Sequence, residues 1–98
     1  MVIVEPRIEI EYCTQCNWML RAAWLAQELL TTFAGIVGEV ALIPGTGGVF
    51  EVRINDTLVW SHKTEGRFPE AKELKQRVRD IVAPEKHLGH SDVKDSDS

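Results

Sequence analysis

Two cysteines are the residues of this chain best suited to covalent chemistry. Cys13 and Cys16 are separated by two residues and are the only cysteines among the 98. Such a pair can cycle between two thiols and one disulfide, and its reactive form is the thiolate. A bridge between residues so close in sequence restricts the unfolded chain very little, so it would stabilise the fold weakly. The spacing therefore predicts redox chemistry rather than structural cross-linking.

The segments on either side of the pair predict how it is held. Residues 7–12 alternate apolar and charged side chains, which is typical of a half-buried strand. Residues 18–33 then carry an apolar stripe at helical spacing, so the cysteines lie where a strand runs into a helix. We expect the helix to begin near Thr14–Cys16, with Thr14 or Asn17 as its cap. The N–H groups and dipole at a helix N-terminus would stabilise a thiolate there.

Length and composition exclude several classes of protein. Ninety-eight residues of which 44% are hydrophobic suit one small globular domain. No apolar run approaches the roughly 20 residues that a membrane span needs. The net charge of −4, without a basic cluster, argues against nucleic acid as the main partner. Because residues 1–6 do not resemble a secretion signal, we expect a cytoplasmic protein.

The rest of the pattern predicts the order β-α-β-β-β-α. Further strands are expected at 38–43, 49–54 and 57–62, the last two joined by a turn at Asn55-Asp56. Residues 44–48 should break regular structure, and 63–67 should form a loop. A second helix is expected from Pro69, ending before Pro84. We predict a folded domain over residues 1–83 and a flexible polar tail over residues 84–98.

The alternation within the strands predicts how the layers are arranged. A sheet covered on both faces would have almost continuously apolar strands, and these strands are not of that kind. Both helices should therefore cover one face of a mixed four-stranded sheet. Leu58 and Trp60 are expected to share a face of the fourth strand. The open face should carry charged residues that pair across strands, namely Arg7, Glu9, Glu11, Glu51 and Arg53.

Several short segments together resemble the selenoprotein W/T/H family, also called Rdx. They are the strand Ile8–Tyr12, the Cys13/Cys16 pair, the loop Pro44–Gly48 and the following Phe50-Glu51-Val52. The similarity covers about residues 7–83. It implies an α/β, thioredoxin-like two-layer sandwich and a thiol–disulfide oxidoreductase whose physiological substrates are poorly defined.

The chain also departs from thioredoxin itself. Tyr12 and Asn17 flank the motif instead of tryptophan. The helix that would cover the second face of the sheet is missing, and the glycine-rich loop stands in its place. Pro44 is the only nearby candidate for the cis proline of thioredoxin relatives, and whether it is cis is left open.

The order in which the cysteines act is also left open. Helix-terminus reasoning makes Cys13 the nucleophile and Cys16 the resolving thiol, and we lean slightly to this order. The family resemblance implies the opposite, because selenium-containing members carry selenocysteine at the second position.

The partners follow from the proposed exchange. The substrate would be a protein with a disulfide or an oxidised thiol, and glutathione or a thioredoxin-type reductant would restore the pair without a bound cofactor or metal. We predict contacts with such partners from six residues, Thr14, Gln15, Trp18, Pro44, Gly47 and Gly48. A homodimer is compatible with the sequence.

Rival interpretations remain at this stage. Cys13 and Cys16 with His87 and His90 form a conceivable zinc set. His62 is expected at the surface, with a proton donor as its functional alternative. The second class of function is a non-enzymatic interaction module that binds a partner through the open sheet face, with the cysteines as a redox switch.

Overall fold

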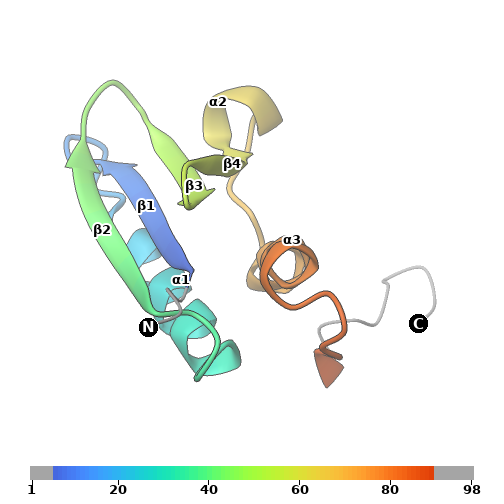
Figure 1. Cartoon of the computed structure of the whole chain (residues 1–98). Helices are drawn as coiled ribbons and strands as arrows, with labels where there is room; N and C mark the ends of the chain where they lie inside the picture. The colour runs from blue at the N-terminus through green and yellow to red at the C-terminus, as the bar shows by residue number, and fades with distance from the viewer. Residues whose placement is uncertain (1–5, 90–98) are drawn as a thin grey trace.

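The computed structural model describes residues 6–89 (Figure 1). Its elements follow the order β-α-β-β-β-α-α. They are β1 (Arg7–Cys13), α1 (Met19–Thr32), β2 (Glu39–Gly45), β3 (Phe50–Ile54), β4 (Thr57–Ser61), α2 (His62–Glu65) and α3 (Ala71–Val82). The four-residue helix α2 occupies the region predicted to be a loop, and the other elements correspond to predicted ones.

The strands form one mixed sheet in the order β2-β1-β3-β4. The central strand β1 is parallel to β2 and antiparallel to β3, which forms an antiparallel hairpin with β4. Asn55 and Asp56 join this hairpin with φ values of 45° and 76°, as a type I′ turn requires. The predicted two-residue turn is therefore confirmed.

Both long helices cover the same face of the sheet. Helix α1 packs against β1 and β2, and α3 packs against β4 and α1. The helical stripe predicted in α1 is buried at Ala22, Leu25 and Leu29 and continues to Phe33. The core between the layers also takes alternate side chains of the two central strands, namely Ile8, Ile10, Val52 and Ile54. The predicted two-layer α/β arrangement is confirmed.

Strand β2 continues through two residues predicted to end it. Pro44 pairs with Tyr12, and Gly45 pairs with Cys13. Proline is tolerated here because β2 is an edge strand, where a missing N–H need not disrupt a second neighbour. Pro44 is not cis, and no peptide bond within residues 6–89 is.

The register of β4 corrects the prediction for Leu58 and Trp60. Trp60 pairs with Val52, but Leu58 pairs with the next residue, Arg53, so Val59 is the extra residue of a β-bulge. The bulge turns Val59 and Trp60 toward the core and leaves Leu58 half exposed. Leu58 and Trp60 therefore do not share a face, because the alternation predicted along this strand is interrupted.

The end of the chain is described only as far as residue 89. Helix α3 begins at Ala71, two residues later than predicted, where the Glu70 N–H donates to the Glu73 carboxylate at 2.8 Å. Beyond it, the Lys86 carbonyl accepts a hydrogen bond from Arg79, and Leu88 packs against the core. The flexible tail remains a prediction, and its residues 90–98 lie outside the described part of the chain.

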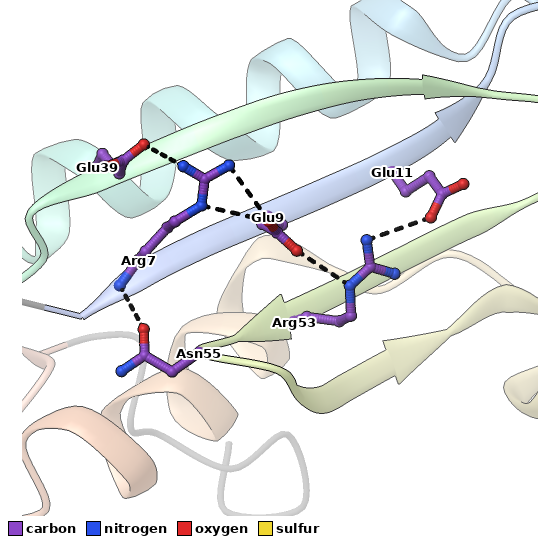
Figure 2. Close-up of polar contacts among 6 residues, drawn as sticks. All are labelled: Arg7, Glu9, Glu11, Glu39, Arg53 and Asn55. Atoms are coloured by element: carbon purple, nitrogen blue, oxygen red, sulfur yellow. Dashed lines mark hydrogen bonds and ion pairs between the residues drawn. The ribbon is translucent and has the colours of Figure 1, made fainter.

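The open face of the sheet carries the predicted cross-strand ion pairs (Figure 2). Arg53 reaches carboxylates on both central strands, at 3.2 Å for Glu9, 3.2 Å for Glu11 and 2.9 Å for Glu51. Arg7 pairs with Glu9 at 3.2 Å and with Glu39 of the edge strand at 2.5 Å. The hydrogen bond from Arg53 is the main cause that lowers the pKa of Glu9.

Replacement of Arg53 by Met tests this network. The free energy of unfolding should fall by on the order of 1 kcal/mol at pH 7, a modest amount because solvent screens these partly exposed ion pairs. That corresponds to a melting temperature lower by about 4–8 °C for a domain of this size. Because the fold lowers the pKa of Glu9, its stabilisation is present above the ordinary carboxyl range and is lost as the pH falls through the folded pKa.

The effect of Arg53→Met should therefore shrink toward pH 3, which melting curves followed by circular dichroism would measure. Arg7→Met is the matched control and should cost less, since its side chain is 43% exposed against 22% for Arg53. An equal loss at pH 7 and pH 3 would contradict the electrostatic interpretation.

Candidate functional site

The cysteine pair begins at the end of the central strand, where main-chain hydrogen bonds hold it. The Cys13 N–H donates to the Val49 carbonyl at 2.8 Å. The Thr14 N–H and hydroxyl both donate to the Gly45 carbonyl, at 3.0 and 3.1 Å. These bonds attach the turn that follows Cys13 to the end of β2 and the loop between β2 and β3. The turn and the loop lie at the same end of the sheet (Figure 1).

Helix α1 begins later than the sequence predicted. Its first residue is Met19, and its cap position is Trp18, whose side chain makes no capping hydrogen bond. Residues 14–17 form a turn instead, and Asn17 has a left-handed φ of 60°. Asparagine tolerates this conformation better than most residues, which explains the residue type at this position. Neither Thr14 nor Asn17 caps the helix, and both cysteines precede it.

The two sulfurs lie close together but differ in access to solvent. The Cys16 thiol donates to Cys13 Sγ at 2.7 Å. Only 1% of Cys13 is exposed, whereas Cys16 is partly exposed. A disulfide could form with little movement of the chain, and a partner would reach Cys16 first.

The environment separates the acidities of the two thiols. The hydrogen bond from Cys16 lowers the pKa of Cys13, and backbone N–H groups of Gly48, Cys16 and Gln15 lower it further against the opposing effect of burial. The same sulfur contact, burial and the negative charge on Cys13 raise the pKa of Cys16. The two shifts therefore favour the thiolate on the buried Cys13 sulfur over the partly exposed Cys16 sulfur when the reduced pair loses a proton.

Gly45, Gly47 and Gly48 shape the loop that faces the pair. Gly47 and Gly48 have φ values of 73° and 75°, which other residues adopt only with strain. At Gly45 the constraint is space, since an added Cβ would lie 2.7 Å from Val49 Cγ1 and 2.8 Å from Glu11 Oε2. The loop can approach the cysteine turn closely because these positions lack side chains.

Trp18 anchors the other side of the turn in an aromatic cluster. Its ring lies 4.8 Å from Phe68 and 6.5 Å from Phe50, both in edge-to-face geometry. The His62 ring lies 5.1 Å from Trp18 and 4.6 Å from Phe68. Trp18 therefore packs against the core, and His62 opens α2 beside this cluster rather than ending a strand at the surface.

Two hollows border the site and contain several of the predicted contact residues. One, of about 480 Å³, is lined by Tyr12, Thr14, Asn17, Met19 and Leu20. The other, of about 350 Å³, includes Gly47, Gly48, His62 and Lys63 in its wall. Gln15 and Pro44 are exposed and line neither hollow.

Sequence reasoning gave too little weight to Leu20 and missed Gly45. Leu20 is 84% exposed although it is apolar, and its position outside the buried helical stripe was a usable signal. The part played by the Gly45 carbonyl depends on strand register, which the sequence alone does not reveal.

The comparisons with known proteins cover most of the chain. The Rdx family model matches residues 7–80. The chain belongs to the Rdx family. Among solved structures it is similar to a selenoprotein W-related protein from Vibrio cholerae, with 59% identity and a TM-score of 0.78 over 81% of this chain and 99% of that one. A protein from Bordetella parapertussis shares 64% identity with a TM-score of 0.77, over 79% of this chain and 98% of that one.

Mammalian relatives are more distant. Migration and invasion enhancer 1 from Bos taurus is 37% identical over 73 residues, and the one from Mus musculus is 36% identical over 72. The matches cover 74% of this chain but only 62% and 61% of those proteins, so the chain spans about three-fifths of their length. The resemblance to selenoprotein W-like Rdx proteins and their thioredoxin-like fold is confirmed, and the family implies a thiol-redox type of function.

Two further features of residues 6–89 bear on the other classes of function. No helix in this part of the chain is both long and apolar enough to cross a membrane. The same residues contain no group of three or more His, Cys, Asp or Glu side chains arranged to hold a metal ion. His90, one member of the zinc set considered above, lies outside the described part.

Replacement of Gly45 by Ala tests the close approach between loop and turn. The new methyl group would collide with the stiff Val49 side chain, and overpacking of this kind costs about 1–3 kcal/mol. Because the Val49 carbonyl accepts from Cys13, the displacement should also change the alkylation rate of the thiols. Chemical denaturation and iodoacetamide kinetics would measure the two effects.

The double variant Gly45→Ala/Val49→Ala is the control for that substitution. Removing the γ-methyl groups of Val49 should restore part of the stability and most of the thiol reactivity. A double variant no better than Gly45→Ala would show that the collision with Val49 is not the cause.

Proposed function

We propose that the chain is a thiol–disulfide oxidoreductase in which Cys16 forms the bond to the substrate and Cys13 resolves it. The observation that carries the proposal is the 2.7 Å contact between a partly exposed and a buried sulfur. Exchange requires a thiolate to reach a disulfide sulfur, so access decides which cysteine meets a partner. Access favours Cys16, against the slight preference for Cys13 that helix-terminus reasoning gave.

The reaction begins with the reduced pair. As Cys16 attacks one sulfur of a substrate disulfide, its proton passes along the hydrogen bond to Cys13, and the substrate disulfide breaks with release of one thiolate. That thiolate takes the proton from Cys13. The Cys13 thiolate then attacks Cys16, the Cys13–Cys16 disulfide forms, and the second substrate thiolate leaves. The pair loses two electrons and the substrate disulfide gains them.

The reverse direction uses the same two sulfurs. A reductant thiolate attacks the exposed Cys16 sulfur of the oxidised pair, and Cys13 departs as the thiolate. A thiol with a lowered pKa leaves faster, so the environment of Cys13 suits this role. We propose glutathione or a thioredoxin-type protein as the reductant and the cytoplasm as the setting. The two hollows would receive the chain of a protein substrate on either side of Cys16.

Single cysteine variants test the order of events. With glutathione disulfide as the probe, Cys13→Ser should accumulate a mixed disulfide on Cys16, because the resolving thiol is gone. Cys16→Ser should accumulate at least about tenfold less at equal time, because Cys13 is buried. Intact mass measures both. Equal accumulation in the two variants would contradict the assigned order, and no adduct in either would contradict the exchange mechanism.

A redox titration tests the reaction class itself. After equilibration in graded glutathione buffers, thiol labelling should reveal one two-electron transition in the range of about −270 to −120 mV that thioredoxin-like proteins span. The Cys13→Ser/Cys16→Ser variant, which has no thiols, should show no labelling at any potential. A wild-type pair that never forms a disulfide would overturn the oxidoreductase proposal.

A further inference from the structure

The two hollows beside the redox pair differ in charge. The lining of the larger hollow, of about 480 Å³, contains no charged residue and includes the exposed apolar side chains of Met19 and Leu20. The smaller hollow, of about 350 Å³, has one carboxylate and one ammonium group in its wall, those of Glu51 and Lys63. A substrate that extends to both sides of Cys16 would therefore meet an apolar surface on one side and a charged surface on the other.

Lys63 supplies the unneutralised charge of the smaller hollow. The Glu51 carboxylate accepts a hydrogen bond from Arg53 at 2.9 Å, so its charge is already paired. Glu65, two residues after Lys63, is paired with Arg77 at 3.2 Å. Lys63 itself is exposed and forms no ion pair with any residue from 6 to 89. The hollow therefore presents a positive charge that the fold itself does not use.

Arg21 is a second cation without a carboxylate partner, and it lies beside the aromatic cluster. Its guanidinium carbon is 4.2 Å from the centre of the Phe68 ring, and that ring contacts both Trp18 and His62. Within residues 6–89 every other arginine is paired with a carboxylate, namely Arg7, Arg53, Arg67, Arg77 and Arg79. The basic rim, which consists of Arg21 and of Lys63 next to His62, thus flanks this cluster in a protein whose net charge is −4.

An approaching side chain has room to reach Lys63. The wall of the smaller hollow also contains Gly47 and Gly48, where even an added Cβ atom would meet no other atom within 4 Å. The groups of a protein substrate that complement a lysine are the carboxylates of Asp and Glu, and a hydrogen bond between an ammonium group and a carboxylate is stronger than one between neutral groups. A carboxylate is therefore the group that fits this hollow.

We propose that the basic rim selects disulfides with an acidic residue next to the reacting cysteine, whose carboxylate pairs with Lys63 in the smaller hollow. This inference rests on the proposed exchange reaction and names the class of its protein substrate. The other neighbour of the reacting cysteine is apolar and packs on Met19 and Leu20. Arg21, on the Phe68 ring, adds to the field that attracts and orients the acidic segment before the sulfurs react.

Short peptides with a mixed disulfide provide the probe. Each is a tripeptide of leucine, cysteine and glutamate with blocked ends, and its cysteine is bonded to 2-thiopyridine. In the reaction Cys16 bonds to the peptide sulfur, the disulfide between peptide and pyridine breaks, and 2-thiopyridone leaves with the proton that Cys16 gives up. A matched peptide has glutamine in place of glutamate. The acid is placed before the cysteine in one pair and after it in another, since a substrate chain can run either way between the hollows.

The acidic peptide should react faster than its glutamine counterpart in at least one of the two orders. At low ionic strength the ratio of their second-order rate constants should be about three to five, the range that one exposed ion pair supports. The ratio should fall toward unity in about 1 M salt, where the screening length shrinks to about 3 Å. The absorbance of released thiopyridone measures the rates.

Variants of Lys63 test whether this residue causes the preference. Lys63→Gln should remove most of it, and Lys63→Glu should reverse it, because like charges repel. Arg21→Gln should lower the ratio by less, since Arg21 does not line the hollow. The ratio is the informative quantity, because a general effect on the thiols acts on both peptides alike. Lys86→Gln is the control, which removes the same charge from a residue beyond α3 and should leave the ratio unchanged.

A binding measurement separates the subsite from the chemistry. For this purpose serine replaces cysteine in the peptides, and the isotope-labelled protein is followed by NMR. The acidic peptide should shift the amide signals of Gly47, Gly48 and Lys63 more than the glutamine peptide does. This difference should vanish in Lys63→Gln.

The inference is overturned if the acidic and glutamine peptides react at equal rates in both orders, or if the preference survives Lys63→Gln. This failure is distinct from failure of the proposed function. Reaction of all the peptides without preference would remove the subsite and leave the oxidoreductase in place. If no peptide forms a mixed disulfide, the exchange mechanism fails, and the NMR difference alone then supports or removes the subsite.

Discussion

The site depends on main-chain hydrogen bonds at the carboxyl end of β1. The Cys13 N–H bonds to Val49, and the Thr14 N–H bonds to Gly45, so the cysteine turn and the glycine-rich loop are held against each other from two directions. Because these are backbone bonds, strand register determines them. With β1 hydrogen-bonded to both neighbours, Cys13 is carried into the core while Cys16, three residues later, remains within reach of a partner.

Because of this arrangement, the cysteine that a partner can reach is not the one whose pKa is lowered. A single exposed cysteine with a low pKa would react readily with any oxidant. Here the environment favours the thiolate on Cys13, where only 1% of the residue is exposed, and the proton on the partly exposed Cys16. In the proposed exchange this arrangement protects the pair until a disulfide reaches Cys16, and the lowered pKa of Cys13 then serves the second step.

The sequence predicted those features that depend on local periodicity. Alternation along β1 and β3 identified the charged face, and the helical stripe from Ala22 to Phe33 identified the buried side of α1. The errors arose where tertiary contacts decide the conformation. The bulge at Val59 appears only when β4 is paired with β3, and Pro44 remains in β2 because that strand is at the edge.

The predicted start of α1 is the error with the largest consequence for the site. The segment before Met19 has residues that can cap a helix, and local propensity favoured a start at Thr14. Asn17 adopts a left-handed conformation instead, and Trp18 packs against the core through Phe50 and Phe68. Packing of this aromatic ring outweighs local capping, and the helix begins after it. The backbone N–H groups that lower the pKa of Cys13 therefore belong to the cysteine turn and the facing loop rather than to α1.

The charged face bears on the choice between an enzyme and an interaction module. Arg53 is already engaged by Glu9, Glu11 and Glu51, so a partner that covered this face would have to remove water from a set of paired charges. Desolvation of such groups is costly, and the centres of protein interfaces are depleted in charge for that reason. The end of the sheet near Cys16 offers exposed apolar side chains at Met19 and Leu20. Burial of paired charges would therefore oppose docking on the open face, whereas the apolar side chains near Cys16 would favour contact at the redox site.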